Sequence, residues 1–348
     1  MNNSSAVLVE FLGPSDPRWT EALQKTPHDF FHLPGYLSAC GVHEGGEPLL
    51  LMLDAGSYGM LIPVIKRSLS QFGEVFSGYF DASSPYGYPG PVCWGDNWED
   101  LVPVMDDILE IFLREQKMVS LFLRLNPFLG ISAEHPTLRG ELKMHGPTVF
   151  LDLRDADESW KAINSRLRSF ITQMLREGCE VRIDQWETLE QVIEAYHETM
   201  GRLNASPFYF FPKAFFQSLK DDTAPHFHLG TSYAPSGEVT GGVFFSEVNG
   251  LIQYFLTGTF MAYSDLSPSK LIINALRLWG LEKGHHTLHL GGGLGAQTEN
   301  LFQFKSRFSK SLATFSTFRK IILPEEYQAL SISRGDNDDF FPIYRKPS

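Results

Sequence analysis

The stretch over residues 288–309, LHLGGGLGAQTENLFQFKSRFS, combines a glycine run with one lysine inside an apolar segment. On a helical wheel of about 100° per residue, Lys305 falls between Leu301 and Phe302 rather than among the polar side chains. An ammonium group that faces inward must find an anion or lose its charge. Three outcomes are open for it: pairing with a buried acid, extension past the end of the helix to solvent, or a role in a ligand site.

The glycine run invites comparison with a dinucleotide-binding turn. Gly291, Gly293 and Ala296 fit the pattern G-x-G-x-x-A. That pattern needs a long helix, a further strand and an acid about twenty residues downstream. Here the expected helix is short and residues 311–318 contain no acid, so we do not expect a nucleotide loop. We expect instead that Gly291 and its neighbour Gly292 let the backbone turn or approach another group closely.

Other chemistry-bearing residues give weaker patterns. The three cysteines are far apart, and histidines gather only at 226–228 and 285–289. No cysteine or carboxylate accompanies these histidines at the spacing of a zinc site, so no metal is expected. No G-x-S-x-G or other nucleophile motif is present.

The elements that must position these residues form a repeated pattern. At 348 residues the chain is long for one core. Each half contains strand pairs, a helix and a further strand, which predicts an α+β fold with a mixed sheet in each of two domains. The segment KMHGPT interrupts the pattern, so we divide the chain into residues 1–148 and 149–348.

In the second half we expect one long helix over residues 157–178, then strands and a second helix. Asn249-Gly250 predicts a tight hairpin between strands 238–248 and 250–259. Ser267-Pro268 predicts the start of a helix, with Ser267 as its N-cap and Gly284 after its end.

Charge and hydropathy exclude some classes of partner. The net charge of −12 argues against non-specific binding to DNA, although a local basic pocket for phosphate is compatible with it. No apolar stretch is long enough for a transmembrane helix, so no integral membrane association is expected. The N-terminal residues lack the features of a signal peptide, and the sparse cysteines suit a reducing cytoplasmic location.

Four stretches together resemble the Fem-type (FemAB-like) transferases, tandem GNAT proteins that add amino acids to cell-wall precursors. They are SPYGYPGP, RSFITQMLREGCEV, LTGTFMAYSDLSPSKLIINALRLWGLEKG and the glycine-to-lysine signature LHLGGG…LFQFKSRFS. The resemblance spans roughly residues 80–315, and the last stretch is the most specific. It implies two GNAT-like domains in tandem, with residues 149–348 carrying the signature.

The resemblance also implies site residues. Lys305 matches the family's lysine near the acyl and phosphate end of the donor, and Arg168 matches an arginine that holds phosphates of a nucleotide-linked acceptor. Arg168 also fits a merely solvated helix face. Phe170, Gln173 and Met174 depart from the family's usual Asn, Lys and Ala, which puts recognition of the same UDP-linked acceptor in doubt.

The chemistry of acyl transfer suggests further candidates. It needs a neutral nucleophile, a donor carbonyl held close and positive potential at the oxyanion. We expect Lys305 and backbone N–H groups near Tyr254 to supply that potential. Tyr254 orients a substrate or is simply packed, and the helix N-terminus at Ser267 is suited to a phosphate. Tyr86 and Tyr88 line an acceptor pocket or only stiffen their loop.

The sequence therefore predicts an acyltransferase that forms an amide on an amine of a cell-envelope or polysaccharide precursor, or of a peptide-like metabolite. Aminoacyl-tRNA and acyl-CoA are the alternative co-substrates, with no tightly bound cofactor. The acceptor is a small molecule or is linked to a nucleotide or lipid. Two alternatives stay open: an acyl-CoA-dependent N-acyltransferase of a sugar amine, and a catalytically silent tandem-GNAT protein that binds a glycan or a partner.

Overall fold

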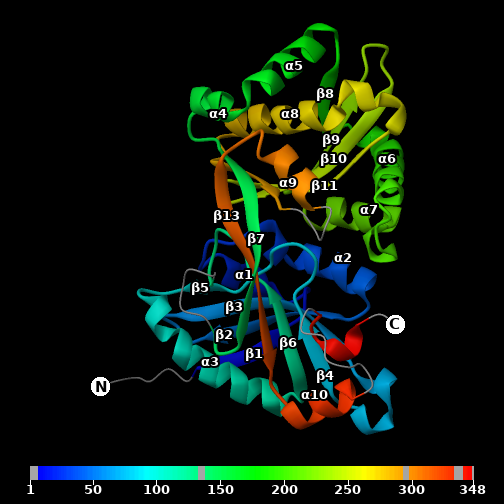
Figure 1. Cartoon of the computed structure of the whole chain (residues 1–348). Helices are drawn as coiled ribbons and strands as arrows, with labels where there is room; N and C mark the ends of the chain where they lie inside the picture. Colours follow the sequence, from blue (N-terminus) through cyan, green and yellow to red (C-terminus); the bar gives the residue numbers. More distant parts are fainter. Residues whose placement is uncertain (1–6, 132–137, 293–297, 333–339, 347–348) are drawn as a thin grey trace. The chain divides into compact units, whose positions relative to one another are not determined.

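The computed structural model describes residues 7–131, 138–292, 298–332 and 340–346 (Figure 1). The chain forms two compact units, Met1–Gly146 with Thr314–Ser348, and Pro147–Ala313. The sequence division placed everything after residue 148 in the second domain, whereas the structure groups the last 35 residues, Thr314–Ser348, with the first unit. The reason is a long-range strand pairing between Thr317–Ile321 and Ser120–Arg124, which no local pattern reveals.

The first unit contains a mixed sheet in the order β1-β2-β3-β4-β6-β13, with β5 paired to β3. A continuous apolar core lies between this sheet and helix α3. The strands are β1 (Leu8–Leu12), β2 (Glu47–Asp54), β3 (Gly59–Ser68), β4 (Phe80–Ser83), β5 (Val92–Trp94), β6 (Met118–Arg124) and β13 (Ser311–Ile321). The helices are α1 (Pro17–Leu23), α2 (Pro34–Glu44), α3 (Trp98–Glu115) and α10 (Pro324–Ser331).

The second unit contains a mixed sheet in the order β7-β12-β11-β10-β9-β8. Its strands are β7 (Glu141–Asp152, which starts in the first unit), β8 (Glu180–Ile183), β9 (Phe227–Tyr233), β10 (Val239–Val248), β11 (Leu251–Thr259) and β12 (Thr287–Gly291). Its helices are α4 (Ala156–Ala162), α5 (Ser165–Arg176), α6 (Leu189–Arg202), α7 (Lys213–Asp222), α8 (Pro268–Lys283) and α9 (Thr298–Lys305).

Strand β10 explains why helices cover both faces of this sheet. Val243 and Phe245 belong to the apolar core that α8 completes. Phe244 instead stacks on Phe216 of α7, with ring centroids 4.1 Å apart. Successive side chains of a strand point to opposite faces, so α8 covers one face and α7 covers the other. A strand buried on both sides reads as a continuous apolar run, as VFF does here.

The expected hairpin and helix start are present, and the expected long helix is not. Asn249 and Gly250 both adopt positive φ between β10 and β11. Pro268 is the first residue of α8, but the Ser267 side chain does not cap it, because Ser267 itself adopts a left-handed conformation. The helix predicted over 157–178 is broken, because Asn164 is extended and its side chain accepts a hydrogen bond from the Arg166 N–H to start α5.

Candidate active site

The parallel strands β11 and β12 are paired over only three residues. Leu251–Gln253 pair with Thr287–His289, after which β11 continues to Thr259 without a β12 partner among the residues that the structure describes. Tyr254 is the first residue past the pairing on one strand, and Leu290 is the first on the other. Beyond this point, the described residues of β12 form no ladder with β11.

A β-bulge lies at the same place in β11. Phe244 of β10 is opposite Leu256, whereas Phe245 is opposite Tyr254, so β11 contains one extra residue at this point. A bulge bends the strand and redirects its backbone groups. The bulge accordingly accompanies the point where β11 and β12 cease to pair.

Lys305 is the last residue of α9 and is 8% exposed. Its Nζ donates a hydrogen bond to the Gly292 carbonyl oxygen at 2.7 Å. Among the side chains that the structure describes, no carboxylate lies within 4.0 Å of Nζ. Burial lowers the pKa of Lys305 to about 7. As the helical wheel predicts, the side chain faces inward; it does not extend into solvent, and no acid among the described side chains pairs with it.

Gly291 and Gly292 place the carbonyl that Lys305 contacts. Gly291 adopts a φ of +73°, a conformation that side chains with a Cβ rarely take. It ends β12 and turns the chain toward Gly292. Gly293 and Ala296, the other members of the glycine pattern, lie outside the described residues.

His289 lies close to Lys305 and was considered from the sequence only as a metal ligand. Its Nδ1 is 2.8 Å from Oε1 of Gln253, across the last pair of β11 and β12. Burial, and secondarily the charge of Lys305, lower the pKa of His289 to about 3. The imidazole is therefore neutral at physiological pH. The sequence signal that could have identified it is its place on a strand, two residues before Gly291.

The ring of Tyr254 packs against apolar side chains, while its hydroxyl has polar neighbours. Its hydroxyl is hydrogen-bonded with Thr257 and Ser269, and burial raises its pKa to about 12. The ring also packs against the apolar core of the second unit. The phenol consequently stays protonated and is suited to orienting a neighbouring group rather than to accepting a proton.

The N-terminus of α8 adds a cation that sequence analysis missed. Nζ of Lys270 is 3.1 Å from Oγ of Ser267 and 4.0 Å from the ring centroid of Phe170 on α5. Burial, and then the charge of Arg307, lower the pKa of Lys270. The helix N-terminus and this ammonium together make the Ser267 corner attractive to anions.

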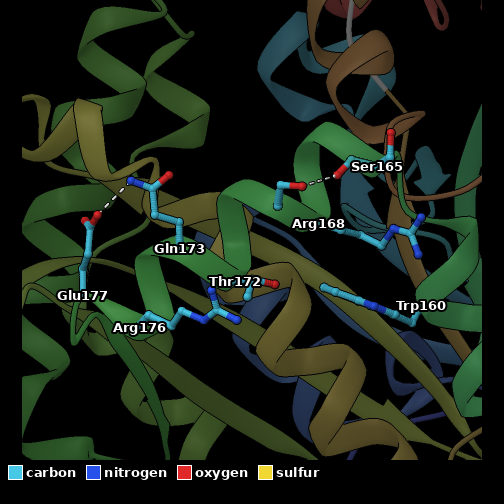
Figure 2. Close-up of a pocket in the computed structure, with 8 residues that line it drawn as sticks. Trp160, Ser165, Arg168, Thr172, Gln173, Arg176 and Glu177 are labelled. Atoms are coloured by element: carbon cyan, nitrogen blue, oxygen red, sulfur yellow. Dashed lines mark hydrogen bonds between the residues drawn. The ribbon is translucent and has the colours of Figure 1, made fainter.

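Arg168 is a partly exposed residue of α5. It lines a depression of about 560 Å³. The wall is formed by Trp160, Ser165, Ser169, Thr172, Gln173, Arg176 and Glu177 (Figure 2). The guanidinium carbon lies 5.9 Å from the ring centroid of Trp160. The backbone N–H of Asn164, which precedes α5, donates to the Arg307 carbonyl at 2.8 Å and so ties this helix to the segment after α9.

Tyr86 and Tyr88 belong to the first unit. The Tyr86 N–H donates to a Glu44 oxygen at 2.9 Å, and its carbonyl accepts from the Tyr36 hydroxyl at 2.6 Å. Tyr88 packs edge-on against Phe315, with centroids 5.3 Å apart. Their loop is thus held by specific contacts.

The histidines divide among different partners. His226 contacts Glu247 at 3.1 Å, and His228 contacts Asp184 at 2.9 Å. Within the described ranges, no group of three or more His, Cys, Asp or Glu residues is arranged to hold a metal ion. Nor does any helix among them have the length and apolar character needed to cross a bilayer.

Comparison with known proteins bears on the fold. The sequence matches no protein-family model and no curated protein. The structure is similar to that of FemX, with a TM-score of 0.69 at 12% identity, covering 92% of this chain and 99% of FemX. L-PGS from Bacillus licheniformis gives a TM-score of 0.51 at 14% identity, covering 88% of this chain and 92% of that one.

A third similar structure is the C-terminal domain of a putative lysylphosphatidylglycerol synthetase from Agrobacterium fabrum. Its TM-score is 0.53 at 12% identity, covering 86% of this chain and 90% of that domain. The α+β fold expected from the sequence, and its likeness to the Fem-type fold, are confirmed.

Proposed function

We propose that this chain is an acyltransferase that forms an amide bond by moving an aminoacyl or acyl group directly to an amine. The observation that carries the proposal is the buried Lys305, which has no acid partner in the described chain and lies against the Gly292 carbonyl where β12 ends. A cation held without an anion in an apolar setting is prepared to stabilise negative charge that develops in a substrate. The Fem-type fold supports the same class of reaction.

In this mechanism the donor carbonyl lies beside the part of β11 that follows its pairing with β12. Backbone N–H groups from Tyr254 to Gly258 and the Lys305 ammonium polarise its oxygen as the amine attacks. The C–N bond forms, the bond from the carbonyl carbon to the donor's leaving oxygen or sulfur breaks, and no covalent enzyme intermediate is needed. The Tyr254 hydroxyl orients the reacting group.

The donor is an aminoacyl-tRNA or an acyl-CoA, used as a co-substrate. Both carry phosphate, for which the α8 N-terminus at Ser267 and the Lys270 ammonium provide positive potential. A donor bound there also brings the anion that favours the charged form of Lys305. We expect the reaction to occur in the cytoplasm, where both donors are made.

The acceptor is the amine of a small-molecule, nucleotide-linked or lipid-linked precursor of the cell envelope or of a polysaccharide, or a peptide-like metabolite. Arg168 supplies a cation for its anionic group. The amine proton leaves to a phosphate or carboxylate of the substrates, since burial keeps Tyr254 a poor base and His289 a weak one.

The test is an amide-forming assay with amine acceptors and two donor pools, charged tRNA and mixed acyl-CoA. If charged tRNA is the donor, RNase treatment should abolish product formation. If acyl-CoA is the donor, CoA depletion should abolish it. Lys305→Ala should lower turnover by about 10²–10³-fold without unfolding the chain. Lys310→Ala, which removes an exposed lysine, is the matched control. Full turnover in Lys305→Ala would contradict the role given to Lys305. Absence of transfer by the wild type with both donor pools would favour a catalytically silent binding protein.

A further inference from the structure

A second depression adjoins that of Arg168 on the surface formed by α4, α5 and α8. Its volume is about 570 Å³. Trp160, Thr172 and Arg176 line both depressions, whereas Arg277 and Leu278 of α8 line only the second. The second depression is therefore a distinct hollow with α8 as one wall.

Arg277 is an unusual residue for a helix that packs on a sheet. It is 5% exposed, and its guanidinium donates to the side chains of Asn274 at 3.2 Å and Ser159 at 3.0 Å. Both acceptors are neutral. Across the residues placed by the structure, no carboxylate comes within 4.0 Å of it. An arginine stays protonated in proteins, so a full positive charge is buried here without a counterion among the described side chains.

The surroundings of Arg277 combine a flat aromatic ring with apolar rim residues. Its guanidinium carbon lies 5.1 Å from the ring centroid of Trp160, which also contacts Arg168. Leu175 and Leu278 line the hollow and are 46% and 50% exposed. Exposed leucines beside a buried cation favour a ligand with an apolar body and one anionic group.

We propose that this hollow binds a small amphipathic anion, with its phosphate or carboxylate at Arg277 and its apolar body against Trp160, Leu175 and Leu278. Arg176, at the exposed rim, adds a second cation for the anionic group. The only acid that lines the hollow, in the part of the chain described, is the exposed Asp157. The inference does not depend on the proposed acyl transfer, because Arg277, Leu175 and Leu278 take no part in it.

The contacts of Arg277 with Ser159 also hold α4 against α8, which is a structural role. That role alone would be served by a neutral donor, without the cost of desolvating a charge. The structural role also does not explain why the Arg277 cation borders an open hollow lined by two exposed leucines. Ligand binding accounts for both features.

The test is calorimetric titration of the full chain with hexyl phosphate, with inorganic phosphate as the probe that lacks an apolar body. Hexyl phosphate should bind at one site, about tenfold or more tighter than inorganic phosphate. Arg277→Met should weaken hexyl phosphate binding by about tenfold or more, and Arg154→Met, which removes an exposed arginine of the same unit, should not. No saturable binding, or equal effects of these two variants, would overturn the proposal.

A second variant keeps the test decisive if Arg277→Met does not fold. Leu278→Glu places a carboxylate at the exposed rim and should abolish hexyl phosphate binding. Leu203→Glu, at an equally exposed leucine directly after α6, should not. Co-sedimentation with phosphatidylglycerol vesicles separates the sources of the anion. If the wild type binds vesicles and Leu278→Glu does not, the anion is a lipid headgroup. If the wild type binds hexyl phosphate but not vesicles, the anion belongs to a soluble ligand. Hexyl phosphate binding that survives in Leu278→Glu would contradict the site.

Discussion

The chemistry proposed for Lys305 depends on whether its amine carries a proton. Burial places its pKa at about 7, so the free protein holds comparable amounts of the charged and neutral forms near neutral pH. Only the charged form stabilises an oxyanion. The neutral His289 beside it does not replace that charge, since its own pKa is about 3.

The pH dependence of kcat/KM reports this ionisation, because kcat/KM follows groups of the free enzyme. We expect kcat/KM to fall as the pH rises through about 7, the pKa of Lys305. Lys305→Arg keeps a charge at all these pH values, so in that variant the fall near neutral pH should disappear, even if turnover is lower. A profile that rises through the same range would instead identify the neutral amine as the active form.

The same ionisation predicts a pH dependence of stability. The unfolded chain binds the Lys305 proton up to about pH 10.5, whereas the folded chain releases it above about 7. Between these values the unfolded state binds more protons, so this group makes the free energy of unfolding rise with pH. Urea unfolding should show wild type gaining stability relative to Lys305→Met across this window, by at most ~1.4 kcal/mol per pH unit. A difference that is constant with pH would mean that the buried amine does not titrate as stated.

At the scale of elements, the site requires β11 to lie directly against α6. A Cβ on Gly258 would come within 2.2 Å of the Tyr196 backbone, which has no room to move inside its helix. We expect Gly258→Ala to destabilise the chain by several kcal/mol or to displace α6, and to reduce transfer with it. Thermal unfolding measures the first effect. Gly201→Ala, where a Cβ meets nothing within 4 Å, should be neutral or stabilise α6 by ~0.5–1 kcal/mol.

How far the sequence predicts these elements depends on how local the signal is. Asn249-Gly250 and Pro268 act on their own neighbours, and the hairpin and the start of α8 follow from them. The inward direction of Lys305 likewise follows from helical periodicity. The sequence does not reveal the break between α4 and α5, because the apolar pattern continues across it. The break arises from Asn164, whose side chain caps the N-terminus of α5.

The contacts of the site that the sequence does not predict depend on tertiary structure rather than on local signals. The contact of Lys305 with the Gly292 carbonyl, and that of His289 with Gln253, depend on which strands are neighbours. Arg277 is hidden within an ordinary amphipathic helix pattern, and its neutral partners on α4 and α8 are known only from the packing of these two helices. Such features need the tertiary arrangement, which pattern analysis does not provide.

At the scale of the molecule, each unit is completed by residues from distant parts of the chain. In the first unit Asp81 is fully buried and lies between Arg67 at 2.8 Å and Arg345 at 2.5 Å. The Tyr344 hydroxyl donates to the same carboxylate at 3.1 Å and lies 2.8 Å from Ser120. These contacts fix the C-terminal segment to β4 and β6, and they explain why it belongs to this unit rather than to the second.

This arrangement predicts a local effect of removing one charge. Arg345→Met leaves the buried Asp81 carboxylate with one fewer charged partner, so we expect the first unit to lose ~1–3 kcal/mol of stability. Hydrogen exchange should show the loss in β4 and β6, with β9 and β10 of the second unit unchanged. Arg154→Met removes an exposed arginine, whose side chain is 77% accessible and pairs with Asp152, and should change stability by less than about 0.5 kcal/mol. Equal loss of protection in β9 and β10 after Arg345→Met would show that the two units unfold together.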